Sequence, residues 1–209
     1  MGITDRRLRQ KEEVRASILD SAWEMVLTEG WQSLSIRKIA DAIEYSVPVI
    51  YSHFESKDAI LLEFNRKGYR LLTEKLIEAK VGQTSPAEQI RAMGRAYWAF
   101  AFNNKEYYQL MFGLGIPTCE AVRKIPEMVL FNEVITSTIV SMVPAGEKIP
   151  FVPFLKYQSF WSMLHGLVSI NMLNKPPGQH EGLPEQVLED VLCSFIRGIE
   201  AVNHPKDSE

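Results

Sequence analysis

Residues 33–64 read SLSIRKIADAIEYSVPVIYSHFESKDAILLEF, and this stretch decides the fold of the first part of the chain. It predicts two short amphipathic helices, the first after the N-cap candidate Ser35 and the second after the N-cap candidate Ser46. Two helices of about eight residues joined by three or four residues fit a helix-turn-helix, whose second helix enters the major groove of DNA. Such helix pairs are also common as plain structural units in all-α proteins, so the pattern alone leaves both interpretations open.

The second of these helices has one apolar face and one face with little charge. Ile50 and Phe54 point inward on a helical wheel. The opposite face suits contact with base edges and thymine methyl groups, and it carries Pro48, Val49, Ser52 and, on its flank, Tyr51. Cations that would hold phosphates at its rim are Arg37, Lys38 and Lys57. A further basic run is by itself more typical of a solvated arm than of a DNA clamp, and it consists of Arg6, Arg7, Arg9, Lys11 and Arg15.

Helical periodicity continues through the rest of the chain, with no alternation typical of β-strands. Gly30 closes a first helix whose apolar stripe begins at Val14. Further helices are predicted at residues 56–80, 86–102, 105–112, 118–143, 150–173 and 184–202, with a disturbance near Pro126. The sequence therefore predicts an all-α fold of about nine helices, with one domain at residues 1–56 and a larger helical domain at residues 57–209. A join inside the helix that begins near Ser56 would couple the two domains rigidly.

Composition and charge exclude several classes of function. The 209 residues carry a formal charge of −3, and 46% of them are apolar, as in an ordinary globular protein. Residues 1–57 hold 8 Lys+Arg against 9 Asp+Glu, so a positive surface for DNA must be local. Cys119 and Cys193 stand apart without a CxxC pattern, and the sequence contains no nucleophile-elbow, zinc-protease or phosphate-loop motif. We therefore expect no metal, no cofactor, no enzymatic activity, no membrane partner and a cytoplasmic location.

Residues 12–64 resemble the DNA-binding domain of the tetracycline-repressor (TetR) family of bacterial transcription regulators. The resemblance rests on a helix closed by Gly30, a Ser-capped helix with Ile39-Ala40, and then Ser46, Pro48, Tyr51, His53-Phe54 and Lys57. By position, the resemblance implies that the base-reading residues are Arg37, Val47, Pro48 and Val49. The residues implied to contact phosphates or the groove edge are Tyr51, His53 and Lys57. Ser35 would sit beside the helix start that meets the DNA backbone, and Ser46 would cap the second helix.

One departure from the family lies in the turn between the two helices. The family usually has Gly where this chain has Glu44, and Val where this chain has Tyr45. A residue with a Cβ at the glycine position predicts a strained or altered turn. The charge of Glu44 would also lie near the duplex, which affects the implied DNA contacts.

The segment FWSMLHGLVSI resembles the Trp…His-Gly signature of one class of TetR-family C-terminal domain, through Trp161, His165 and Gly166. The family resemblance implies that the last two long helices form a homodimer, packing as a four-helix bundle with their symmetry mates. The apolar stripe of the last helix fits this independently, because it is wider than one neighbouring helix needs. The predicted interface residues are Leu188, Val191, Leu192, Phe195 and Ile199.

Residues 90–173 are rich in aromatic side chains and methionines, with few charges at 98–112 and 157–173. A cavity with such walls favours a flat or aliphatic, mostly uncharged effector and disfavours sugar phosphates and nucleotides. The candidate lining residues are Trp98, Phe102, Tyr107, Phe112, Met128, Phe131, Trp161 and His165. Each aromatic residue has plain core packing as an alternative, and His165 is either a core histidine bonded to a carbonyl or a polar contact in the cavity.

Together these features predict a homodimeric transcription regulator, most simply a repressor, that binds a pseudo-palindromic operator in double-stranded DNA and responds to a small molecule. Two alternatives stay open. One is an all-helical small-molecule enzyme whose first helices are structural, and the other is a dimeric DNA-binding protein without a ligand.

Overall fold

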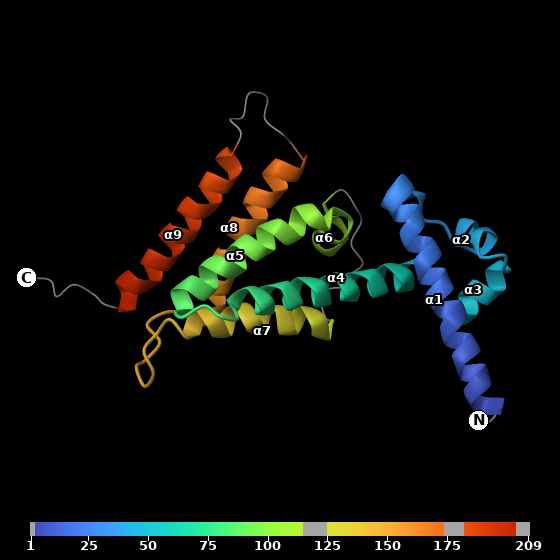
Figure 1. Ribbon diagram of the computed structural model, residues 1–209, viewed down its shortest axis with the longest axis horizontal. Helices are drawn as coiled ribbons and strands as arrows, with labels where there is room; N and C mark the ends of the chain where they lie inside the picture. Colours follow the sequence, from blue (N-terminus) through green and yellow to red (C-terminus); the bar gives the residue numbers. More distant parts are fainter. Residues whose placement is uncertain (1–2, 115–124, 174–181, 204–209) are drawn as a thin grey trace, which may run out of the picture. The chain divides into compact units, whose positions relative to one another are not determined.

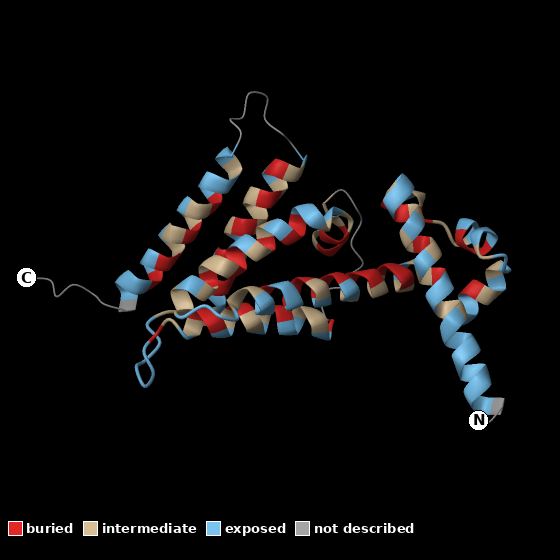
Figure 2. Cartoon of the chain, in the orientation of Figure 1, coloured by how far each residue is buried: buried red, intermediate tan, exposed pale blue. Residues whose placement is uncertain are grey.

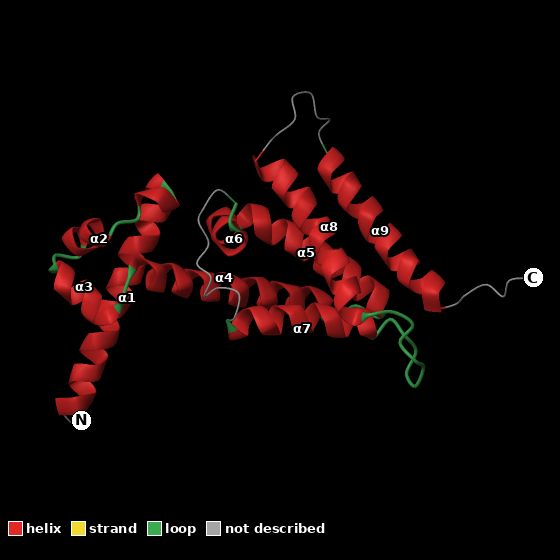
Figure 3. Ribbon diagram, turned by 180° about the vertical axis from the view of Figure 1, so that it is seen from behind, coloured by secondary structure: helices red, strands yellow, loops and turns green. Residues whose placement is uncertain are grey.

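The computed structural model describes residues 3–114, 125–173 and 182–203 of the chain. Every regular element within these residues is a helix, which confirms the predicted all-α class (Figures 1 and 3). In chain order the helices are α1 (Ile3–Glu29), the 3₁₀ turn η1 (Trp31–Ser33), α2 (Ile36–Ala42), α3 (Val47–His53), α4 (Lys57–Lys80), α5 (Pro86–Asn103), α6 (Lys105–Phe112), α7 (Pro126–Val140), α8 (Pro153–Leu173) and α9 (Leu183–Asn203).

Two helices begin at places that differ from the prediction. α1 begins at Ile3, well before the first apolar residue of its stripe, because residues 5–13 contain good helix formers and no glycine or proline. α7 begins at Pro126, a position where proline suits a helix because its missing N–H is not needed. The predicted part of this helix before residue 125 lies outside the described residues, as does Cys119.

The chain divides into two compact units. The first unit contains the described residues up to Lys67 together with Glu106–Leu114, and the second contains residues 68–105 and the described residues from 125 onward. Helix α4 therefore contributes its first half to one unit and its second half to the other.

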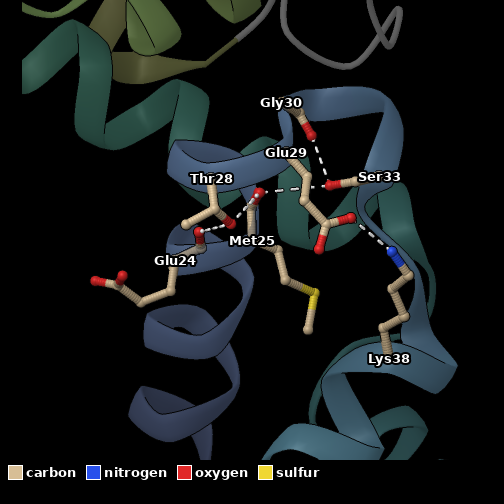
Figure 4. A network of polar contacts seen from close by, with 7 residues as sticks. All are labelled: Glu24, Met25, Thr28, Glu29, Gly30, Ser33 and Lys38. Atoms are coloured by element: carbon tan, nitrogen blue, oxygen red, sulfur yellow. Dashed lines mark hydrogen bonds and ion pairs between the residues drawn. The ribbon is translucent and has the colours of Figure 1, made fainter.

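The core of the first unit is built from the inner faces of α1 to α4 (Figure 2). Burying a Val or Ile side chain contributes about 1.5–3 kcal/mol to folding, and burying the methyl group of Ala contributes less. The fully or nearly fully buried aliphatic side chains of this unit include Ile18, Ala22, Val26, Ile39, Ala40, Ile50 and Ile60. Gly30 ends α1 at a φ of 82°, as expected of the residue that closes this helix. Ser33 Oγ donates to the Gly30 carbonyl at 2.7 Å and so fastens η1 to the end of α1 (Figure 4).

Helix α6 packs with this first unit. The Trp31 indole Nε1 donates to the Glu106 carbonyl at 2.9 Å. Tyr107 stacks on Trp23 of α1, with ring centroids 4.1 Å apart and 21° between the ring planes. These two contacts hold the start of α6 against α1 and η1.

The second unit is arranged around α5, which packs against α7, α8 and α9. At the start of α5, Ser85 and Glu88 form a complete capping box. Gly94 allows α5 to approach α9 closely, since a Cβ at this position would lie 2.4 Å from a methyl group of Leu192. Arg95 and Glu189 join the same two helices, with 2.5 Å between Arg95 Nε and Glu189 Oε1.

Candidate nucleic-acid interface

Helices α2 and α3 form the helix-turn-helix that the sequence predicted. Each is seven residues long and begins directly after the predicted serine, Ser35 or Ser46, which has an extended backbone conformation. Ile39 and Ala40 of α2 and Ile50 of α3 are at most 1% exposed. The inner faces of both helices are therefore anchored in the first unit, and the opposite face of α3 is exposed.

The outer face of α3 carries no Lys, Arg, Asp or Glu. Pro48, Tyr51 and Ser52 are exposed, whereas Val47 and Val49 are half-buried. The Ser52 hydroxyl donates to the Val49 carbonyl at 2.7 Å. Such a face can make apolar and hydroxyl contacts with base edges. The predicted outward orientation of Pro48 and Ser52 is confirmed, and their contacts with DNA stay predictions.

The turn between α2 and α3 holds Glu44 in the left-handed region, at a φ of 58°. The Tyr45 amide donates to the Ala40 carbonyl at 2.9 Å and the Glu44 amide donates to the Asp41 carbonyl at 3.3 Å. These are the two hydrogen bonds of a Schellman motif, which puts a left-handed residue just beyond the helix end, usually glycine. The expected strain at Glu44 is therefore confirmed, and the turn keeps the geometry of the glycine version.

The two N-cap serines do not cap through their side chains. In α3 the Val49 amide donates instead to the Ser46 backbone carbonyl at 2.9 Å, and Pro48 has no amide hydrogen to donate. The side-chain cap expected of Ser46 is therefore wrong for this structure. Its exposed hydroxyl stays available to solvent or to a phosphate oxygen.

The three cations predicted at the rim of α3 differ in their surroundings. Arg37 is exposed, and Lys57 is half-buried as the first residue of α4. Lys38 pairs with Glu29 at the end of α1, with 2.7 Å between Nζ and Oε2 (Figure 4). Both partners of this ion pair are about half exposed, so the pair is weak. A phosphate bound by Lys38 must nevertheless compete with the Glu29 carboxylate, which makes Lys38 the least suited of the three cations.

His53 ends α3 in a half-buried position. Burial, and then the positive charges of Lys11 and Arg15, lower the pKa of its imidazole. Its Nδ1 is buried and has no hydrogen-bond partner in the described part of the chain. A neutral imidazole donates one hydrogen bond but brings no positive charge to a phosphate. The role implied for His53 is thus limited to a hydrogen bond.

Six of the eight predicted ligand-lining residues belong to the second unit. Phe131 is 1% exposed and packs edge-on against Tyr69, with ring centroids 5.8 Å apart. Trp161 stacks on His165, with ring centroids 5.0 Å apart and 9° between the ring planes. Burial lowers the pKa of His165, so its imidazole is neutral at pH 7. Both interpretations of His165 are compatible with this position.

Trp98 and Phe102 form another aromatic pair, one turn apart on α5, with ring centroids 4.6 Å apart. Phe102 is 40% exposed, whereas Trp98 and Met128 are half-buried. The predicted residues of this unit thus include a buried one, Phe131, and an exposed one, Phe102.

Tyr107 and Phe112 belong to the first unit instead. Both lie on α6, whose first turn is held against α1 and η1 by the contacts of Trp31 and Tyr107. The eight predicted lining residues are therefore divided between the two units, and their role in binding a ligand stays a prediction. The helical spacing indicated aromatic faces, but it did not indicate which helices those faces meet.

Sequence reasoning missed a polar pair in the second unit, made by buried Tyr157 and half-buried Asn132. The Tyr157 hydroxyl of α8 donates to Asn132 Oδ1 of α7. Burial raises the pKa of Tyr157 to about 12 and raises the pKa of the nearby Tyr69 as well. Polar hydroxyls in an apolar surrounding are the groups that orient a ligand in a pocket. The available signal was a tyrosine and an asparagine within apolar stretches, which gives no indication that the two residues meet.

The residues predicted for the dimer interface are largely turned inward. Leu188, Leu192 and Ile199 are at most 3% exposed within the protomer. Val191 is half-buried, and Phe195 packs against Phe160 of α8 with ring centroids 5.2 Å apart. The apolar stripe of α9 is therefore mostly covered by α5 and α8 of the same chain. Leu188, Leu192 and Ile199 belong to the protomer core, which corrects the assignment based on the width of the stripe.

The described residues include no group of three or more His, Cys, Asp or Glu side chains that could hold a metal ion. None of the described helices has the length and apolar character needed to cross a membrane.

Two family models match the chain, one in each part. A model described as bacterial regulatory proteins of the tetR family matches residues 18–64, and a model described as tetracyclin repressor-like C-terminal domain matches residues 90–195. The chain therefore belongs to the tetR family of bacterial regulatory proteins. The Trp…His-Gly class of its C-terminal domain stays a prediction.

Three similar proteins illustrate the range of relatives. The HTH-type transcriptional activator FasR of Mycolicibacterium smegmatis is 28% identical over 102 residues, which are 49% of this chain and 47% of FasR. The chain thus matches about half the length of this curated relative. The structure of FadR from Bacillus subtilis in complex with stearoyl-CoA has a TM-score of 0.67 at 18% identity, over 86% of this chain and 98% of that one. AibR in complex with isovaleryl coenzyme A and operator DNA has a TM-score of 0.60 at 18% identity, over 86% and 96% of the two chains.

Proposed function

We propose that the protein is a homodimeric, ligand-responsive repressor whose two α3 helices enter successive major grooves of a pseudo-palindromic operator. The observation that carries this proposal is the exposed, nearly uncharged outer face of α3 on a helix-turn-helix whose inner face is fully buried. Ligand binding in the second unit would reach α3 through α4, because this helix has residues in both units. Changing the DNA-bound fraction from nearly all to nearly none requires about 5.5 kcal/mol of differential ligand binding.

The proposed contacts with DNA divide into reading and positioning. Arg37 and the first turn of α3 would read bases, because an exposed guanidinium can form two hydrogen bonds with guanine. Tyr51 and Lys57 would position the helix by donating to phosphate oxygens. Ser35 and Ser46 would add hydroxyl donors to the DNA backbone, since neither hydroxyl is engaged in capping its helix.

We place the dimer interface on the exposed sides of α8 and α9. On α8, Leu155 and Ile170 are 60% and 57% exposed, so this helix offers apolar side chains that a second copy of the chain would cover. On the same two helices, a Cβ added at Gly166 or Gly198 would meet no atom within 4 Å inside the protomer. Small residues beside exposed apolar ones would let a second pair of helices pack closely against this face.

The proposed effector has a substantial apolar part. The aromatic groups of the second unit, together with the Tyr157–Asn132 pair, offer apolar walls and a few polar groups. FadR and AibR were solved with stearoyl-CoA and isovaleryl coenzyme A, and both ligands join an apolar acyl chain to a charged coenzyme A moiety. Acyl-CoA thioesters are therefore the first effectors to test, beside uncharged aliphatic and aromatic compounds.

A gel-shift titration tests the proposal. The probe is the DNA upstream of the chain's own gene, with a duplex of unrelated sequence as competitor and the candidate effectors added in separate series. We expect a shift that resists the competitor and is reversed by one class of effector. Equal binding to both duplexes would refute sequence-specific recognition, and a shift that no effector reverses would favour the dimeric DNA-binding protein without a ligand.

In vitro transcription from the same DNA distinguishes repression from activation. Activation is the alternative to test, because FasR is named a transcriptional activator. Membership of a regulator family supports a role without catalysis, in place of the all-helical enzyme.

A further inference from the structure

The first half of α1 extends past the buried core of its unit as an exposed, charged helix. Residues 4–13 are all exposed, and Figure 2 shows this half of α1 in pale blue. Three cations follow one another here at intervals of four residues, namely Arg7, Lys11 and Arg15. Residues spaced by four lie on one side of a helix, so the three side chains form one stripe, which we call the α1 basic stripe.

The α1 basic stripe continues the face by which α1 packs on the other helices of its unit. At 100° per residue, Ile18 and Ala22 point within about 20° of Lys11, and both are completely buried. α2 and α3 pack against this same helix. The stripe therefore runs along the side of α1 that faces α3, beyond the point where the core ends.

Direct contacts place the stripe beside the C-terminal end of α3. The Arg15 guanidinium lies 4.7 Å from the ring centroid of Phe54, the residue that follows α3, and 3.1 Å from the Glu63 carboxylate. Lys11 and Arg15 are both near enough to His53 to lower the pKa of its imidazole. The positive charges thus begin next to the helix proposed to read the operator.

The acidic residues of this segment lie elsewhere on α1. Arg6, Arg9, Gln10 and Glu13 line a hollow on the opposite face of the helix. Within the described residues, Arg7 and Lys11 form no ion pair, in contrast with Arg15, which is paired with Glu63. Two cations of the stripe therefore keep their charge unneutralised although 9 Asp+Glu are present in residues 1–57.

We propose that Arg7 and Lys11 form a second, sequence-independent phosphate-binding surface that extends the DNA contact of each protomer beyond the groove read by α3. This inference rests on the proposed function, since it requires α3 to lie on DNA. The two residues are about 6 Å apart along the helix axis. One DNA strand carries a phosphate for about every 3.4 Å of duplex axis, so two phosphates close together on one strand can be contacted at once.

The test is the salt dependence of DNA affinity for two matched double variants. Arg7→Ala/Lys11→Ala removes the stripe, and Arg6→Ala/Arg9→Ala removes the same charge from the opposite face of the same exposed segment. The probes are the DNA upstream of the chain's own gene and a duplex of unrelated sequence. Each lost phosphate contact lowers the slope of log affinity against log salt by about 0.9, so the stripe variant should lose about two units on both probes. The wild type should then weaken about tenfold more than the stripe variant between 50 and 200 mM salt.

Three outcomes decide the matter. The inference is supported if the salt slope falls only in the stripe variant and if Arg7→Lys/Lys11→Arg, which keeps both charges, has the wild-type slope. Equal slopes for the two double variants, with specific binding intact, overturn it and leave the proposed function standing. If the wild type binds neither probe, both the proposed function and this inference fail. Because all four substituted side chains are exposed, thermal melting should show the same folded state in every variant.

Discussion

Replacing Glu44 by glycine tests the strained turn of the helix-turn-helix. Glu44 has a φ of 58° at the Schellman position, where the Tyr45 amide must reach the Ala40 carbonyl. A residue with a Cβ in the left-handed region destabilises the folded state by about 1–2 kcal/mol. Glycine removes this strain, but its greater chain entropy stabilises the unfolded state by about 0.5–1 kcal/mol. We therefore expect Glu44→Gly to raise the free energy of unfolding by about 0.5–1 kcal/mol.

Thermal and urea unfolding measure this change directly. For a chain of this length, about 2–4 °C corresponds to 1 kcal/mol, so the melting temperature should rise by about 2 °C. The slope of the free energy against urea concentration should not change, because the same surface is exposed on unfolding.

Glu44→Ala is the matched control, because alanine removes the carboxylate but keeps the Cβ and therefore the strain. We expect it to give no gain in stability. Both variants should bind DNA more tightly than the wild type, since both remove a negative charge from the exposed turn beside α3. Equal stabilisation by alanine and glycine would show that charge, and not the backbone, sets the effect, and a loss of stability in Glu44→Gly would refute the reasoning.

Three further predictions concern the dimer, the DNA contacts and the buried tyrosine. Ile199→Glu should destabilise the protomer by at least about 3 kcal/mol, because it buries an unpaired charge. Ser194→Glu, on the exposed side of α9, should instead give folded monomers. Circular dichroism measures folding and light scattering measures the oligomeric state, and a stable dimer of Ser194→Glu would refute the proposed interface. Lys57→Ala should weaken binding to all duplexes uniformly, whereas Arg37→Ala should relax the preference for particular operator bases by about 1–3 kcal/mol. Competition gel shifts measure both effects. An equal loss of affinity for all duplexes in Arg37→Ala would make Arg37 a phosphate contact. Burial raises the pKa of Tyr157 to about 12, so the folded state keeps a proton that the unfolded state loses above its ordinary pKa near 10. Stability should therefore fall as pH rises from about 10 to 12, and Tyr157→Phe should show a smaller fall in urea titrations; an equal fall in both proteins would assign the effect to other groups.

The local features of the fold were readable from the sequence. Gly30, the Ser85–Glu88 capping box and the proline that begins α5 act within a few residues of themselves. The apolar stripes of α2 and α3 depend only on helical periodicity, and the helix-turn-helix follows from them. Even the left-handed turn at Glu44 was predictable, because the resemblance supplied the expectation of glycine there.

The tertiary structure alone decided which surfaces these stripes meet. Periodicity shows that one side of α9 is apolar, but not that Leu192 faces Gly94 of the same chain instead of a second protomer. It shows that α6 is aromatic, but not that Tyr107 stacks on Trp23. The reason is physical, because burying a hydrophobic stripe lowers the free energy against any apolar partner of suitable shape. The period of the stripe therefore determines that this side of the helix is covered, but it does not determine which surface covers it. The partner is chosen by packing between residues far apart in the chain, and only the folded structure contains those distances.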